Sequence, residues 1–270
     1  MALVDSERVS PDKARTKLIL GATWALQVAL NAYCGTHKIN GEDNATVSAA
    51  YPTLITPAGW AFSIWGIIFL AQGFFVGYQC FGKKAHPLSP TFVLAWSANM
   101  VAGGLWSVPF AFKMLKLCLA IMALIVFTLI VMYQELHPWM TSAFPSCSAR
   151  YWCGEMAISI HLAWVSVASI VNTAVVLTDM GWNDPSQYTV EATVIMQAVA
   201  LALAIAMVYL HQDIMFAAVV VWAFTAIRSA QSEEAVRIMA RVVVWVLYAC
   251  ILGTCAWKGY NWRRGALELA

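Results

Sequence analysis

Long apolar runs separated by short polar connections constrain this chain more than any other feature. Eight runs follow one another, and each is close to the ~20 residues that a helix needs to cross ~30 Å of hydrocarbon. Only 11% of the 270 residues are charged, against about 25% in soluble domains. We therefore predict an all-α, multi-pass transmembrane helix bundle. The predicted spans are 17–34, 59–81, 91–112, 114–133, 154–178, 189–210, 212–230 and 236–257.

The connections between the spans differ in length. Only Lys113 separates the third and fourth spans, which predicts a tight hairpin. The sixth and seventh spans meet at residues 211–213, and we interpret His211 and Asp213 as loop residues. If one such pair is a single helix, the chain has seven spans. Polar tails are predicted at 1–16 and 259–270.

The positive charges give a weak orientation signal. With eight spans both termini lie on one side, and that side holds more of the Lys and Arg residues than the other. The positive-inside rule then places the termini in the cytoplasm, stroma or matrix. The lipid bilayer is the predicted partner, and no basic block suggests nucleic-acid binding. The sequence does not name the membrane, whether mitochondrial, plastid or plasma membrane.

Polar residues inside the spans are the informative ones, because placing them in hydrocarbon costs free energy. Thr23, Gln27 and Asn31 form one stripe on the first span. Asn99 lies within the third span and is followed by two glycines, which allow close helix packing. Such residues are typical of hydrogen bonds between helices. The stripe could equally line a polar cavity.

The fifth span is the richest in polar and aromatic side chains. His161 and Asn172 fall near one face, and Trp164 lies one turn from the histidine. A histidine on an apolar helix is commonly a hydrogen-bonded core residue. It could also be an axial ligand for the metal of a tetrapyrrole.

No catalytic motif is present in the sequence. It contains no GxSxG, no HExxH and no Gly-rich phosphate loop. No second histidine or carboxylate stands one turn from His161, so no protein metal site is predicted. We predict that the protein is not an enzyme.

A stiff aromatic segment precedes the second span. It reads YPTLITPAGWAFSIWGIIFL over residues 51–70, and its prolines restrict the backbone while its tryptophans offer flat apolar faces. Two later segments carry further polar and aromatic positions. They are FVLAWSANMVAGGLWSVPF and ISIHLAWVSVASIVNTAVV.

These three segments, in this order, resemble the TspO/MBR family, the tryptophan-rich sensory proteins related to the peripheral benzodiazepine receptor. The loop here carries Thr56-Pro57 and Ala61-Phe62 where the family commonly has Lys-Pro and Pro-Pro, and Val167 stands at an aromatic family position. With His161 added from the span itself, the candidate ligand-binding residues are Pro57, Trp60, Phe62, Trp65, Asn99, Trp106, His161, Trp164 and Asn172.

The resemblance covers residues 17–178 as a five-helix unit and is closest to longer relatives with three further helices, here 179–258. It implies a bundle, often a homodimer, that binds a small hydrophobic ligand of the tetrapyrrole or sterol class under the loop after the first helix. A porphyrin, haem or chlorophyll would be a ligand, and no cofactor is firmly implied. The implied roles are sensing, transport or tetrapyrrole handling.

One alternative is a non-catalytic subunit of a larger membrane complex, such as a pigment-bearing photosynthetic assembly. In that case His161, Asn99, Asn172 or Gln72 could ligate chlorophyll magnesium. A solute transporter is disfavoured, because the sequence shows no inverted repeat and no pair of interrupted helices.

Overall fold

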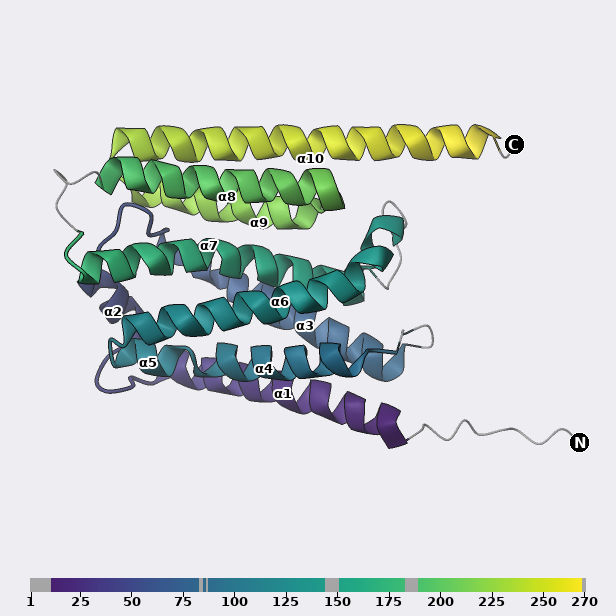
Figure 1. Cartoon of the computed structure of the whole chain (residues 1–270), viewed down its shortest axis with the longest axis horizontal. Helices are drawn as coiled ribbons and strands as arrows, with labels where there is room; N and C mark the ends of the chain where they lie inside the picture. The colour runs from purple at the N-terminus through teal and green to yellow at the C-terminus, as the bar shows by residue number, and fades with distance from the viewer. Residues whose placement is uncertain (1–10, 83–84, 86, 144–150, 183–188, 269–270) are drawn as a thin grey trace, which may run out of the picture.

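The chain forms a bundle of long helices that run side by side (Figure 1). The computed structural model describes residues 11–82, 85, 87–143, 151–182 and 189–268. The elements are α1 (Pro11–Thr36), α2 (Asn44–Ala50), the 3₁₀ helix η1 (Gly59–Ser63), α3 (Ile64–Phe81), α4 (Pro90–Leu105), α5 (Ser107–Ala111), α6 (Leu115–Ala143), the π-helical turn η2 (Tyr151–Glu155), α7 (Met156–Asp179), α8 (Thr189–His211), α9 (Ile214–Ala230) and α10 (Glu234–Glu268).

The predicted helical membrane fold is confirmed. Within the described part of the chain, seven helical segments are long and apolar enough to cross a membrane. They are the segments Lys13–Thr36, Gly59–Phe81, Pro90–Ala111, Leu115–Leu136, Met156–Asp179, Thr189–His211 and Glu234–Asn261. The remaining predicted span, 212–230, is α9, whose 17 residues make it a shorter apolar helix.

The long helices of the bundle contact one another in a continuous series. α1 packs on α3 and α4, α4 packs on α6, and α6 packs on α7. α9 packs against α7, and it also contacts α8 and α10. The three C-terminal helices are therefore joined to the first five spans mainly through α9. Both termini lie at one end of the bundle, and α2 and α5 lie at the other (Figure 1).

α9 is surrounded by protein on most of its circumference. Its buried side chains include Phe216, Val220, Phe224 and Ile227, each at most 1% exposed. A helix that is apolar all round belongs in an interior. Because its neighbours cover it, α9 does not need the full length of a lipid-facing span.

Local interactions stabilise the α5–α6 turn and α2 at the end of the bundle opposite the termini. Lys113, with φ 56°, forms the predicted tight turn between α5 and α6, and its Nζ lies 3.1 Å from Glu42 Oε1. Asp43 caps α2 by accepting from the Thr46 backbone N–H at 2.8 Å. That hydrogen bond lowers the pKa of the Asp43 carboxyl.

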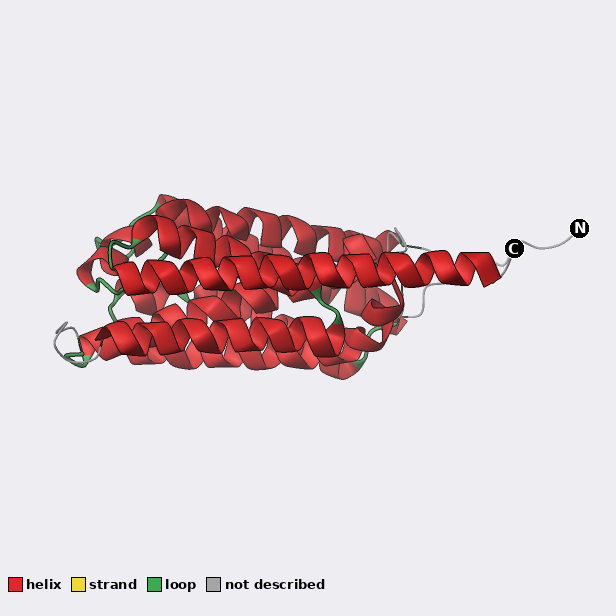
Figure 2. Cartoon of the chain, turned by 90° about the horizontal axis from the view of Figure 1, so that it is seen from above, coloured by secondary structure: helices red, strands yellow, loops and turns green. Residues whose placement is uncertain are grey.

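Two helices reach into the predicted polar tails. α1 begins at Pro11. Proline fits the first turn of a helix because backbone N–H groups there have no acceptor within the helix, so the lack of an N–H costs nothing. α10 continues to Glu268, and Figure 2 shows it extending past the neighbouring helices. Its last residues include Arg, Leu, Ala and Glu, which favour helix.

Candidate functional site

The loop before α3 is held by α9, a helix from the C-terminal part of the chain. The Gln231 side-chain amide donates to the carbonyl of Thr56 at 2.7 Å and to that of Thr53 at 3.3 Å. Further along, the Ala58 N–H donates to the Ala226 carbonyl at 3.2 Å. The loop is therefore built into the interface between the first five spans and the C-terminal three.

The same helix also holds the start of α3. Trp222 Nε1 donates to the Ala61 carbonyl at 3.0 Å, and the Trp222 ring meets Trp60 edge-on with centroids 4.9 Å apart. Pro57 is buried. Non-helical backbone at membrane depth is tolerated where protein surrounds it, and α9 supplies that surrounding here.

Trp60 and Trp65 lie on different sides of the helix start. Trp60 is 44% exposed and contacts α9, whereas Trp65 faces α7. The five residues Gly59–Ser63 form a 3₁₀ turn before α3, which sets the angle between the two indoles. The structure thus does not gather both tryptophans at one point.

Phe62 and Trp65 meet the fifth predicted span in an aromatic cluster. We use this name for Phe62, Trp65, Phe69, His161 and Trp164. The centroid of Phe62 lies 5.8 Å from that of Trp164, and Trp65 lies 5.7 Å from His161 and 6.4 Å from Trp164. These edge-to-face distances fall in the favourable range for ring pairs. The cluster joins α3 to α7 and reaches the surface at Phe62, which is 47% exposed.

Two N–H groups within this cluster lack acceptors. An amide nitrogen only donates, so the contact of 3.1 Å between Gln72 Nε2 and His161 Nδ1 makes Nδ1 the acceptor. In this orientation of the Gln72 amide, whose Oε1 has no partner in the part of the chain that the structure describes, the proton of the neutral imidazole is assigned to Nε2. Among the described residues, neither His161 Nε2 nor Trp164 Nε1 has a hydrogen-bond partner, although both side chains are buried.

The other candidate residues lie outside the cluster. Asn99 Nδ2 donates to the Ile125 carbonyl at 3.1 Å and to Thr128 Oγ1 at 2.9 Å, so it connects α4 to α6. Trp106 donates to the Cys118 carbonyl at 3.3 Å. Asn172 is buried further along α7, and its Oδ1 has no partner in the described part of the chain.

The polar stripe of the first span packs on α4. Asn31 Nδ2 donates to the Gly103 carbonyl at 3.2 Å, and Trp96 Nε1 donates to Thr23 Oγ1 at 3.1 Å. A Cβ added at the next residue, Gly104, would lie 3.3 Å from the Gln27 Cα and 2.9 Å from Leu30 Cδ1. This glycine therefore permits the close approach of α1 and α4, as its place in the sequence suggested. The hydrogen bonds connect the two helices.

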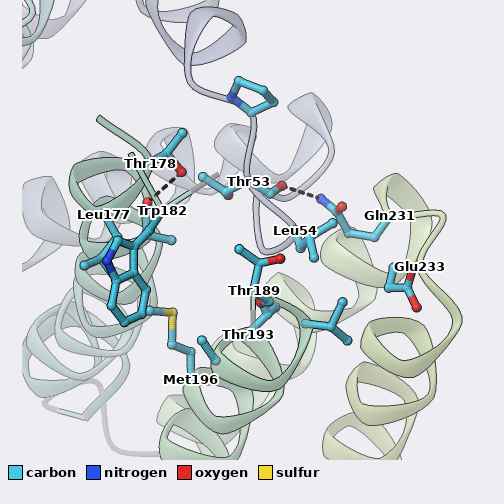
Figure 3. A pocket seen from close by; sticks show the side chains of 14 residues that line it. Thr53, Leu54, Leu177, Thr178, Trp182, Thr189, Thr193, Met196, Gln231 and Glu233 are labelled. Atoms are coloured by element: carbon cyan, nitrogen blue, oxygen red, sulfur yellow. Dashed lines mark hydrogen bonds between the residues drawn. The ribbon is translucent and has the colours of Figure 1, made fainter. Parts of the chain in front are cut away.

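A pocket opens near the loop, at the end of the bundle opposite the termini. It has a volume of about 350 Å³ and lies between the loop, the end of α7, the start of α8 and the α9–α10 connection (Figure 3). None of the nine candidate residues lines it. Sequence patterns offered one weak signal, the pair Thr189 and Thr193 one turn apart on an apolar helix. Its lining residues are Pro52, Thr53, Leu54, Ala174, Leu177, Thr178, Trp182, Thr189, Val190, Ala192, Thr193, Met196, Gln231 and Glu233.

Of the two residues interpreted as loop residues, His211 is the last residue of α8, whereas Asp213 is in the loop as predicted. The sequence did not predict the burial of Asp213, which lies in the connection between α8 and α9 but is only 3% exposed. Its Oδ2 accepts from Ser159 Oγ at 2.7 Å and from Tyr133 Oη at 2.9 Å, and its Oδ1 accepts from the Phe216 N–H at 3.0 Å. An aspartate immediately before an apolar helical run is a helix N-cap signal, and Asp213, directly before the run that forms α9, offered that signal in the sequence.

Comparison with known proteins identifies the family. Neither the curated proteins nor the solved structures gave a match. A family model described as TSPO-like protein matches residues 17–255. The match continues beyond residue 178 through α8 and α9 and into α10, in agreement with the contacts that join these helices to the loop. The chain is an integral, multi-pass membrane protein and belongs to the TSPO-like protein family.

Proposed function

We propose that this protein binds a flat, conjugated small molecule of the tetrapyrrole class at the aromatic cluster. The observation that carries the proposal is the pair of buried N–H groups, on His161 and Trp164, that have no acceptor among the described residues. Leaving a buried donor without a partner costs ~1–3 kcal/mol. Unpartnered buried amide nitrogens also occur at Gln27 and Gln197, but the two donors of the cluster lie beside aromatic faces that can stack on a flat ligand. A ligand that brings acceptor oxygens supplies the missing partners.

The chemistry of the cluster favours a tetrapyrrole over a sterol. Indole and phenyl faces stack on flat conjugated rings, and Phe62 and Trp65 pack against the two rings that carry the donors. The carboxylates of a porphyrin accept hydrogen bonds from N–H groups, whereas a sterol offers a single hydroxyl and a body that is not flat. Ligand entry would displace the half-exposed Phe62 ring.

The position of the cluster supports a sensing, transport or tetrapyrrole-handling role. η1 contributes both Phe62, in the cluster, and Ala61, whose carbonyl accepts from Trp222 on α9. A ligand that moves Phe62 would therefore also move the contact between the loop and α9. In this way the occupied and empty states could differ in the packing of the C-terminal helices.

The test is a titration of detergent-purified protein with protoporphyrin IX, followed by quenching of tryptophan emission. Trp164→Phe keeps an aromatic ring and removes the N–H, so we expect binding to weaken about tenfold, the factor that ~1.4 kcal/mol represents. Trp245→Phe, on the exposed face of α10, controls for the loss of one fluorophore. Absence of saturable quenching in a folded sample would sink the proposal.

A second candidate function is a non-catalytic subunit of a larger membrane complex. The observation in its favour is α10, whose 35 residues span about 52 Å at 1.5 Å per residue, more than a bilayer core requires. Trp257 and Tyr260 are exposed on its distal part. A complex of fixed stoichiometry on native gels, lost in the double variant Trp257→Ala/Tyr260→Ala, would support this alternative. A monomer or homodimer in native membranes would contradict it.

A further inference from the structure

The pocket shown in Figure 3 is separate from the aromatic cluster. Its α7 wall begins at Ala174, 13 positions after His161, which is about 20 Å along a helix. Its opposite wall comes from α8, and none of the five cluster residues takes part. The pocket therefore depends on the packing of the C-terminal helices against the loop.

The walls of the pocket are mainly apolar. Leu54, Leu177 and Met196 face the space from three different elements, and the Trp182 indole lies along one side (Figure 3). A volume of about 350 Å³ lies within the range of small-molecule sites, ~300–1,000 Å³. The space accommodates a compact apolar body, such as a pair of fused rings.

The polar lining offers more acceptors than donors to a ligand, although the Thr189 hydroxyl and the Trp182 indole N–H can donate. Thr178 Oγ1 donates its proton to the Ala174 carbonyl at 3.0 Å, and Thr193 Oγ1 donates to the Thr189 carbonyl at 2.7 Å. Each hydroxyl therefore keeps only lone pairs for a ligand. The Gln231 amide nitrogen donates both of its hydrogens to loop carbonyls. Its side-chain carbonyl oxygen is therefore the atom that remains for a ligand, and it is an acceptor.

The charge of the lining has one sign. Glu233 stands exposed at the rim, and no Lys, Arg or His is among the lining residues that the structure describes. A ligand carboxylate would meet lone pairs and a like charge there. A ligand that donates hydrogen bonds would meet acceptors, and a cationic one would also be attracted to Glu233.

We propose that this pocket binds a compact amphiphile with an apolar ring body and a hydrogen-bond-donating head, an alcohol or a protonated amine. The head would be directed to Thr178 and Thr193, with the body against Leu177, Met196 and Trp182. A porphyrin, which carries carboxylates, is not a ligand of this second site.

The test uses three ligands with one body: 2-naphthylmethanol, 2-naphthylmethylamine and 2-naphthoic acid. Each is titrated calorimetrically into the detergent-purified full chain, and a titration into empty micelles is subtracted. We expect the alcohol or the amine to bind saturably and at least tenfold more tightly than the acid. Equal affinities, tightest binding by the acid, or no saturable binding to folded protein would overturn the proposal.

Substitutions then locate the binding. Ala192→Leu adds volume to the pocket wall and should abolish binding, whereas Ala198→Leu, on the exposed side of the same helix, should leave it unchanged. Thr193→Val keeps the side-chain shape, removes the acceptor and should weaken binding several-fold. Glu233→Gln should weaken only the amine, which separates ionic attraction from simple donation. Binding that survives both Ala192→Leu and Thr193→Val would contradict the site.

The proposals for the two sites can be tested independently of each other. Trp164→Phe should weaken protoporphyrin IX and leave the naphthyl ligands unaffected, and Ala192→Leu should do the reverse. A loss of both activities in either variant would mean that the two sites are not separate. Thermal unfolding of each variant in detergent shows whether the bundle is intact.

Discussion

Two buried polar side chains, those of Asp213 and His161, differ in how many of their polar atoms have a hydrogen-bond partner. Asp213 is 3% exposed and accepts three hydrogen bonds, from Ser159, Tyr133 and the Phe216 backbone. His161 is fully buried, yet its one hydrogen-bond contact is with Gln72, and Nε2 has no partner in the described part of the chain.

This difference distinguishes buried polar groups that stabilise the fold from buried polar groups that are available to a ligand. A buried polar group adds little net stability when it is satisfied and costs free energy when it is not. The Asp213 contacts connect α6, α7 and the start of α9, so they hold the bundle together. The unpartnered Nε2 of His161 opposes folding, and the proposed ligand would supply its missing acceptor. Substitutions at partnered groups should therefore lower stability, and those at unpartnered groups should lower ligand binding.

The largest effect is expected from Asp213→Ala. This change removes the acceptor of three hydrogen bonds and the cap of α9, so we expect the free energy of unfolding to fall by about 3–5 kcal/mol. SDS-titrated unfolding, followed by circular dichroism, measures it. Glu191→Ala, which alters an exposed acid on α8, is the control. A loss below ~1 kcal/mol would show that the hydrogen bonds of Asp213 do not stabilise the bundle, which would contradict its contrast with His161.

Asn99→Ala should have an intermediate effect. Its amide joins α4 to the Ile125 carbonyl and to Thr128 on α6. Hydrogen bonds between membrane helices contribute about 0.6–1.7 kcal/mol, and the small cavity adds to the loss. We expect a decrease of about 1–2 kcal/mol in the same unfolding assay. Ser97→Ala, which removes a hydroxyl bonded within its own helix, should be close to neutral.

Gln231→Ala should affect the loop more than the bundle. The amide makes two hydrogen bonds to loop carbonyls, and we expect a loss of about 1 kcal/mol. Faster proteolysis within residues 51–58 is the specific measurement, compared with Ser232→Ala at the exposed neighbouring position. Unchanged cleavage would show that Gln231 does not restrain the loop.

The smallest effect on stability is expected from Trp164→Phe. The indole N–H of Trp164 has no acceptor in the described structure. Its removal relieves the cost of an unpartnered donor, while the smaller ring loses packing, so these opposing effects should leave the free energy of unfolding within about 0.5 kcal/mol of its original value. The same variant is expected to lose protoporphyrin affinity. A marked loss of stability together with unchanged affinity would place Trp164 with Asp213 among the structural groups.

The sequence alone determined the helices and the family. Apolar runs of membrane-spanning length predicted the positions of the helices, and the turn at Lys113 followed from a single charged residue between two runs. Both signals are local, since hydropathy and chain breaks act within a few residues. The TspO-like resemblance likewise rested on short segments, and the family match over residues 17–255 confirms it.

Only the tertiary structure decided which helices meet. The loop at Thr56 accepts from Gln231, 175 positions further along the chain, and nothing local to either residue predicts that contact. Asp213 lies in a connection as predicted, but nothing near it in the sequence predicts its hydrogen bonds from Ser159 and Tyr133, which belong to two other helices. The pocket likewise needs α7, α8 and the loop together. Lateral packing in a membrane bundle depends on the shapes of apolar faces, and a single-sequence hydropathy pattern does not specify them.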